Sequence, residues 1–124
     1  MSKNNKRILV VDDEEAMLFG FTRVLQSPEI DIDTAQALSE ATKLINDKKY
    51  NVIVADLRLT NSTEMEGLDI IRFAKEKQPE CKVIVLTAYG EKDTKEKVHA
   101  LGADFYFEKP VSPKNIKEII DKLD

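Results

Sequence analysis

The chain has 124 residues, of which 42% are hydrophobic and 34% are charged, a balance typical of one folded, water-soluble domain. Its formal net charge of −4 gives no electrostatic basis for direct nucleic-acid binding. The single cysteine, Cys81, excludes an internal disulfide and a multi-cysteine metal site, and it is expected to be an inert packing residue. The sequence shows no signal peptide and no apolar run of membrane length, which predicts a cytoplasmic protein without membrane contact.

Short apolar runs alternate along the chain with amphipathic stretches of helical length. Continuous runs rich in Val and Ile predict strands covered on both faces, whereas the alternating run IDIDTA predicts an edge strand. Strands are expected at 7–11, 30–34, 51–55, 82–86 and 104–107, and helices at 14–26, 37–47, 65–77, 91–100 and 113–122.

This alternation with short connections predicts a parallel sheet with right-handed crossovers. Five such units favour an α/β fold, a three-layer, doubly wound (βα)5 sandwich of the flavodoxin-like type with strand order 2-1-3-4-5. No repeat or low-complexity segment is present, so residues 1–124 are expected to form a single domain, with 1–6 as a flexible tail.

Local signals refine the helices. Asp13 is a candidate cap for the first helix, and Ser112 before Pro113 supplies a cap and a favourable first residue for the last. The helix at 91–100 has apolar residues at only one end and charge at the other. It is therefore either a solvated surface helix or a weakly anchored moving part.

Polar residues stand at the carboxyl ends of four predicted strands. Asp12 and Asp13 follow the first strand, Asp56 the third, Thr87 the fourth and Lys109 the fifth. Because these ends share one edge of a parallel sheet, the five side chains are expected to converge. Each position has an ordinary structural explanation taken alone, such as a helix cap or a solvated loop acid. Their conjunction is the inventory for a phosphoryl group on an aspartate beside a divalent cation, since Mg²⁺ prefers oxygen ligands.

With these residues in place, the chain resembles a receiver domain of a two-component response regulator over essentially its whole length. The resemblance implies that Asp12 and Asp13 are the acidic metal-binding pair and that Asp56 is the phospho-acceptor. It also implies the remaining roles of the site: Thr87 as the switch hydroxyl, Tyr106 as the switch aromatic, Lys109 as the phosphate-binding lysine, Pro110 as a cis proline, the backbone carbonyl of Arg58 as a metal ligand, and Asp12 acting through water.

The same resemblance implies a mechanism. A sensor histidine kinase or a phosphotransfer protein would donate a phosphoryl group to Asp56 with Mg²⁺ bound, and Mn²⁺ or Ca²⁺ would substitute. The domain would be a self-phosphorylating and self-dephosphorylating switch without separate substrate turnover. The face made by the fourth helix, fifth strand and fifth helix would then change its affinity for an output domain or a downstream protein, or form a dimer. His99, the only histidine, lies outside the expected site, so the phosphodonor must come from elsewhere.

One segment departs from the family pattern. After Asp56 the loop is long, with Thr60 where a proline is usual and Gly67 placed late. It is either a tolerated surface insertion or a segment, Asn61 to Glu66, that overhangs the site.

Two other functions are alternatives to the receiver interpretation. A haloacid dehalogenase-type phosphohydrolase also uses a strand-end aspartate, but Arg58 stands where that family needs a second aspartate. A flavodoxin-like cofactor binder would need a phosphate-cradling loop after the first strand, where Asp12 and Asp13 stand instead. Within the receiver interpretation, a stand-alone signalling protein and a piece of a longer regulator both stay open.

Overall fold

A parallel sheet of five strands forms the centre of the computed structural model, which describes residues 6–56, 65–87 and 92–123, with only the backbone described at 65–67 and 92–94. The strands are β1 (Lys6–Val11), β2 (Ile30–Ala35), β3 (Val52–Asp56), β4 (Lys82–Thr87) and β5 (Phe105–Glu108). Their order is β2-β1-β3-β4-β5, and every neighbouring pair is parallel. The predicted topology is confirmed, including the edge position of β2.

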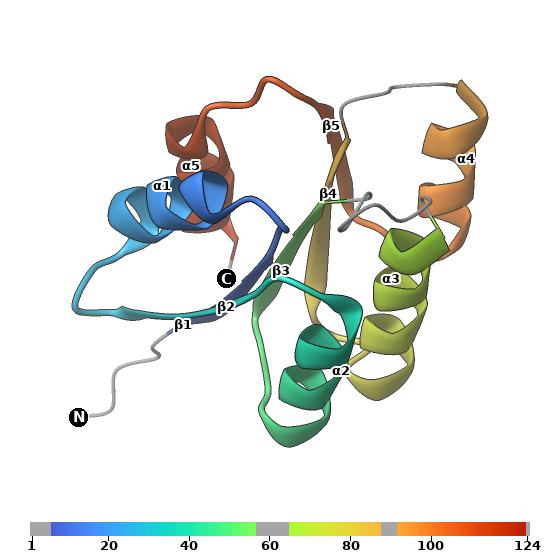
Figure 1. The fold of residues 1–124 in the computed structure, drawn as a ribbon, viewed down its shortest axis with the longest axis horizontal. Coiled ribbons are helices and arrows are strands. Elements are labelled where there is room, and N and C mark those ends of the chain that lie inside the picture. The colour runs from blue at the N-terminus through green and yellow to red at the C-terminus, as the bar shows by residue number, and fades with distance from the viewer. Residues whose placement is uncertain (1–5, 57–64, 88–91, 124) are drawn as a thin grey trace.

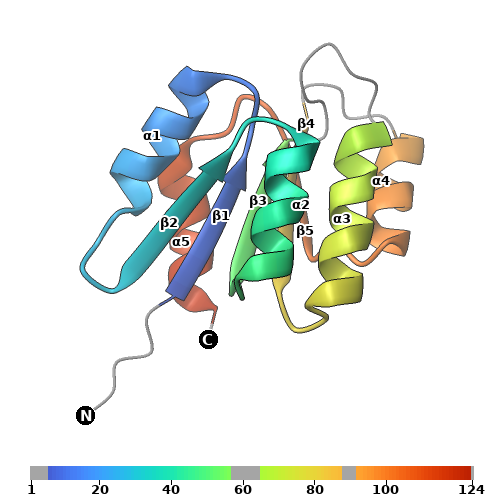
Figure 2. The same ribbon diagram turned by 60° about the horizontal axis from the view of Figure 1, so that its bottom comes forward.

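Five helices cover the two faces of the sheet (Figures 1 and 2). They are α1 (Glu15–Leu25), α2 (Leu38–Asp47), α3 (Met65–Lys77), α4 (Lys92–Ala100) and α5 (Pro113–Lys122). Helices α1 and α5 lie on one face, and α2, α3 and α4 lie on the other, which completes the three layers. Among the described residues, no helix has both the length and the apolar character needed to cross a membrane.

The central strands are apolar throughout because both of their faces are covered. In β1, Ile8 and Val10 join the core beneath α1 and α5, whereas Leu9 and Val11 join the core beneath α2 and α3. All four are at most 1% exposed. Successive side chains of a strand point to opposite faces, so two hydrophobic cores require a continuous apolar run.

The ends of the elements show where local signals mislead. Asp13 as a helix cap is wrong: Glu14 holds the cap position of α1 without a side-chain hydrogen bond, and the Glu14 N–H donates to Asp12 Oδ1 at 2.9 Å. Ser112 is confirmed as the cap of α5, since its hydroxyl oxygen accepts from the Lys114 N–H at 3.2 Å. Lys6, expected in a flexible tail, instead begins β1 opposite Ile30.

Helix α4 is loosely attached to the rest of the molecule. Among its described side chains only Val98 is buried, and the others, His99 included, are exposed. Little apolar burial holds this helix in place, which supports its interpretation as a weakly anchored element.

Cys81 is buried, and burial raises the pKa of its thiol to about 12. It is therefore an unreactive packing residue, as predicted.

Helix α1 offers a matched test of the core. Phe21→Ala should lower the free energy of unfolding by about 3–5 kcal/mol, because Phe21 is fully buried and its removal leaves a cavity. Phe19→Ala in the same helix should cost less than about 1 kcal/mol, because Phe19 is 63% exposed and lies beneath the Arg23 guanidinium, 5.5 Å from its ring centroid. Urea unfolding of both variants measures the difference, and equal losses would contradict this packing.

Candidate functional site

The predicted site residues come together at the carboxyl edge of the sheet. Asp12 directly follows β1, and Lys109 directly follows β5. Asp56 and Thr87 were expected just past their strands but are the last residues of β3 and β4, because the strand ladders extend to the pairs Asp56 with Leu86 and Thr87 with Glu108. Pairing of parallel strands thus carries groups from distant parts of the chain to one edge.

Three carboxylates form the acidic centre of this edge. Asp12 is 1% exposed and Asp56 is 6% exposed, while Asp13 is half-buried. One oxygen from each of the three lies within 4.8 Å of the others. Carboxylates so close and so little hydrated repel one another, so the cluster needs positive charge nearby.

Lys109 supplies one such charge. Its Nζ lies 3.0 Å from Asp56 Oδ2 and 3.4 Å from Asp12 Oδ2, and it donates a hydrogen bond to both. The side chain of Lys109 is only 17% exposed, so these ion pairs are shielded from water. One ammonium faces three carboxylates, which leaves the described cluster with an excess of negative charge.

Backbone contacts fix the positions of these charges. The Asp12 N–H donates to the Ala35 carbonyl oxygen at 3.0 Å, and the Lys109 N–H donates to the Thr87 carbonyl oxygen at 2.7 Å. The Lys109–Pro110 peptide bond is cis. The site is therefore attached to the ends of β2 and β4 as well as to its own strands.

The pKa values follow from burial and from this crowding. Burial, opposed by the hydrogen bond from Glu14 and reinforced by the charge of Asp56, raises the pKa of Asp12 to about 6. For Lys109, burial acts to lower the pKa, but Asp56 and Asp12 outweigh it and raise the pKa above its ordinary value. Lys109 therefore stays charged at neutral pH, while the Asp12 carboxylate is the strained member of the cluster.

The carboxylates fit a small divalent cation. Opposite ligands of Mg²⁺ lie about 4 Å apart and those of Ca²⁺ about 5 Å apart. The three oxygens lie within 4.8 Å of one another, which is near the size of such a coordination shell, so they could converge on one cation. A cation would also offset the cost of burying the Asp12 carboxylate and its repulsion from Asp56, which together raise the pKa of Asp12. Arg58, expected to add its carbonyl oxygen, lies outside the described residues, as do loop residues 60–64.

Thr87 and Tyr106 connect this edge to the surface beside α4. Thr87 is 2% exposed. Tyr106 stands opposite Val85 in the β4–β5 ladder, its ring packs against the core on the α2, α3 and α4 face, and its hydroxyl oxygen is buried. The aromatic side chain is thus directed inward in this structure.

Glu14 is a residue that the structure brings to the site and that sequence reasoning missed. Its Oε1 lies 3.8 Å from Lys109 Nζ, although its side chain is 64% exposed. The signal was the run of four acids, Asp12 to Glu15, but only the first two positions were interpreted as functional.

Comparison with known proteins identifies the family. The model of the response regulator receiver domain matches residues 8–121. The photosynthetic apparatus regulatory protein RegA of Cereibacter sphaeroides is 29% identical over 112 residues, which cover 90% of this chain and 59% of that protein. The chain spans only 25–60% of the length of the curated relatives it matches.

Solved structures agree. A CheY-like receiver domain protein from Methanospirillum hungatei JF-1 superposes with a TM-score of 0.86 at 27% identity, covering 95% of this chain and 92% of that one. A Burkholderia pseudomallei response regulator, solved with a phosphorylated aspartic acid, a calcium ion and citrate, has a TM-score of 0.82 at 31% identity and covers 97% of this chain and 67% of its own. The sequence match, the strand order and the acidic edge of the sheet agree, and the chain belongs to the response regulator receiver domain family.

Proposed function

We propose that Asp56 accepts a phosphoryl group from a sensor histidine kinase or a phosphotransfer protein and that the domain thereby acts as a cytoplasmic signalling switch. The observation that carries this proposal is the position of Asp56, buried at the carboxyl edge of the sheet with Oδ2 3.0 Å from Lys109 Nζ and inside the acidic cluster. A carboxylate placed between fixed positive charge and cation ligands suits phosphoryl transfer, which depends mostly on positioning and electrostatics.

The chemistry assigns one step to each side chain. A carboxylate oxygen of Asp56 forms a bond to phosphorus while the bond from phosphorus to the donor imidazole nitrogen breaks, and that nitrogen keeps the electron pair. The Lys109 ammonium then pairs with a phosphoryl oxygen in place of the Asp56 carboxylate. The Thr87 hydroxyl donates a hydrogen bond to a second phosphoryl oxygen. In the later hydrolysis, a water oxygen forms a bond to phosphorus as the bond from phosphorus to Asp56 breaks, which releases inorganic phosphate and returns Asp56 to its carboxylate form.

Asp12, Asp13 and Asp56 would hold Mg²⁺, with the Arg58 carbonyl oxygen as a further proposed ligand and water between the ion and Asp12. When bound, the ion neutralises charge on the carboxylates and on the phosphoryl oxygens. The calcium ion of the Burkholderia pseudomallei structure supports a cation at this site, and Mn²⁺ is expected to substitute.

The output would be a shift in the equilibrium between two conformations of the face formed by α4, β5 and α5. Withdrawal of the Thr87 hydroxyl toward the phosphate would change the space available to Tyr106, whose partly buried ring packs against the same core cluster as Val98 of α4. New contacts at the phosphate favour one arrangement of this face. An output domain, a downstream protein or a second copy of the domain would bind preferentially to one conformation of this face.

Phosphorylation is tested by intact mass after incubation with acetyl phosphate and Mg²⁺. Wild-type protein should gain one phosphoryl group, and Asp56→Asn should gain none because the nucleophilic oxygen is missing. Asp69→Asn, a change of an exposed acid on α3, is the matched control and should behave as wild type. Equal phosphorylation of wild type and Asp56→Asn would disprove the assignment.

Cation binding should appear as stabilisation. At a Mg²⁺ concentration of one hundred times Kd, the free energy of unfolding should rise by about 2.7 kcal/mol, because the ion binds only the folded cluster. Asp13→Asn should lose most of this gain, whereas Asp69→Asn should keep it. Thermal melts with Mg²⁺ and with EDTA measure both, and an undiminished gain in Asp13→Asn would rule out the ligand set.

The pKa of Asp12 predicts a pH dependence in EDTA. The folded state raises this pKa from 3.8 to about 6, so it binds a proton that the unfolded state releases between these values. Ionisation of Asp12 therefore lowers the free energy of unfolding, by on the order of 1–3 kcal/mol, as the pH rises from about 4 to 6. Asp12→Asn should stabilise the metal-free protein at pH 7 and much less at pH 4. Urea unfolding at both pH values checks this, and a gain that does not change with pH would refute it.

A further inference from the structure

Glu14 is the exposed member of the group of charges around Lys109. Among the described carboxylates that pair with Lys109 Nζ, those of Asp12 and Asp56 belong to side chains that are 2% and 8% exposed, whereas the side chain of Glu14 is 64% exposed. Glu14 is also outside the group of three acids whose oxygens are placed to hold a cation. Its carboxylate therefore stands on the open side of the site, in front of the buried acids.

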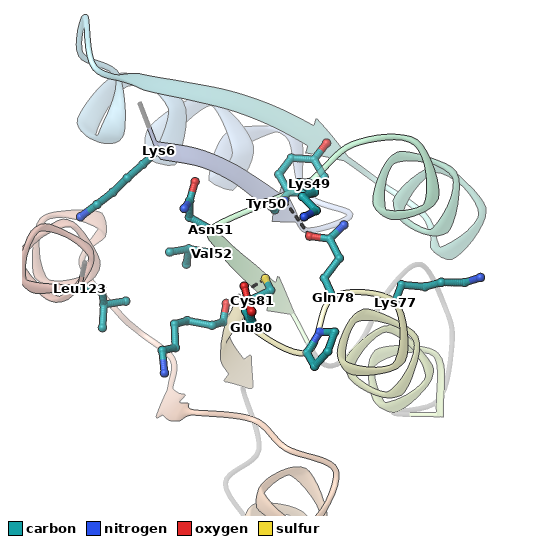
Figure 3. Close-up of a pocket in the computed structure, with 12 residues that line it drawn as sticks. Lys6, Lys49, Tyr50, Asn51, Val52, Lys77, Gln78, Glu80, Cys81 and Leu123 are labelled. Carbon is teal, nitrogen blue, oxygen red and sulfur yellow. Dashed lines mark hydrogen bonds between the residues drawn. The ribbon is translucent and has the colours of Figure 1, made fainter. Parts of the chain in front are cut away.

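A phosphodonor reaches Asp56 from this open side, at the carboxyl edge of the sheet. A hollow of about 450 Å³ lies at the opposite edge and is shown in Figure 3, where Val52 and Cys81 lie near its centre. These two side chains are only 1% and 2% exposed, and every residue of β3 from Val52 to Asp56 is buried. The buried strand closes the path from that hollow, so donors approach on the side where Glu14 is exposed.

The backbone holds Glu14 in place independently of its charge. Its N–H donates to Asp12 Oδ1 at 2.9 Å, and its carbonyl oxygen accepts from the Met17 and Leu18 N–H groups at 3.1 and 3.2 Å. The side chain makes no capping hydrogen bond to α1, and its Oε1 lies 3.8 Å from Lys109 Nζ instead. Replacing the carboxylate with an amide therefore removes one negative charge from the open side and leaves these backbone contacts intact.

The charge of Glu14 is close enough to affect the transfer. Lys109 Nζ lies 3.8 Å from Glu14 Oε1 and 3.0 Å from Asp56 Oδ2, so these two oxygens are within about 7 Å of each other, a distance at which two unit charges in water change a rate by roughly two- to fourfold. This distance is shorter than the screening length of about 10 Å at 0.1 M salt. The effect should therefore be modest but measurable.

We propose that Glu14 is a specificity-determining residue that disfavours small acyl phosphates as phosphodonors, relative to donors whose leaving group is positively charged. This inference rests on the proposed phosphorylation of Asp56. An Asp56 oxygen bonds to phosphorus while the bond from phosphorus to the leaving group breaks, and the leaving group keeps the electron pair. Because the two groups lie roughly in line with phosphorus, the leaving group faces the open side, where Glu14 is exposed.

The leaving groups differ in charge. Acetyl phosphate releases acetate, an anion, and the Glu14 carboxylate repels the negative charge that develops there. Phosphoramidate is attacked with its nitrogen protonated and releases neutral ammonia, and the same carboxylate attracts the ammonium form. The imidazole of a phosphohistidine, which leaves as a neutral group once protonated, resembles phosphoramidate in this respect. Glu14 would thus favour a histidine phosphodonor over free acyl phosphates.

The test is the donor ratio, the rate constant for phosphorylation of Asp56 by acetyl phosphate divided by that for phosphoramidate, followed by intact mass at pH 7. Glu14→Gln should raise this ratio about two- to fourfold, because repulsion of acetate and attraction of the ammonium are both lost. Glu14→Asp, which keeps the charge, should stay closer to wild type than Glu14→Gln. The control Glu15→Gln removes an exposed acid from the first turn of α1 and should leave the ratio near the wild-type value.

Cation binding is measured separately for each variant. Thermal melts with increasing Mg²⁺ and no phosphodonor give the Mg²⁺ affinity, and the donor ratios are then compared at saturating Mg²⁺. A ratio that changes only below saturation would assign Glu14 to cation binding and overturn the inference. Raising the salt from about 0.05 to 0.5 M should shrink the difference between wild type and Glu14→Gln, because salt screens exposed charges.

The outcomes separate this inference from the proposed function. Phosphorylation of Asp56 with the same donor ratio in wild type and Glu14→Gln would overturn the role of Glu14 alone. An equal change in Glu15→Gln would do the same, because it would reduce the effect to the overall charge of the protein. If neither donor phosphorylates Asp56, both proposals fail.

Discussion

The ion pair between Lys109 and the buried Asp56 organises this molecule's candidate chemistry. Burying a carboxylate is costly unless a charge or several hydrogen bonds compensate, and the Lys109 ammonium lies 3.0 Å from Asp56 and 3.4 Å from Asp12. The compensation is incomplete, since three carboxylates share one ammonium. Burial, reinforced by the charge of Asp56, raises the pKa of Asp12, and the excess negative charge within the described cluster favours the proposed cation.

The fold is what makes this pairing available. Asp12 and Lys109 are 97 residues apart in the chain, and they meet because β1 and β5 end at the same edge of a parallel sheet. The central strands β1, β3 and β4 must be covered on both faces to hold that edge out of water, which explains their uninterrupted apolar runs.

This dependence explains what sequence reasoning could and could not predict. The alternation of runs placed every strand within one residue of its position at each end, and strand ends placed Asp12, Asp56, Thr87 and Lys109 together. Asp13 was misassigned as a cap because capping depends on backbone angles that composition does not encode. Glu14 was missed because its place depends on where a long side chain settles, and no periodic pattern in the sequence reports that.

The two ends of the sheet differ in what can move. Strand β3 is buried along its whole length and paired on both sides, so a change at Asp56 is poorly transmitted along it toward Val52. Toward α4 the structure is less firmly held. Thr87 ends β4, Tyr106 packs against the core on that face, and Val98 is the one buried side chain among those described in α4. Displacement is cheapest where the least apolar surface must be exposed. A phosphate on Asp56 would therefore act toward α4 and β5 rather than through the centre of the sheet, which is why a rigid core and a loosely held helix belong to the same switch.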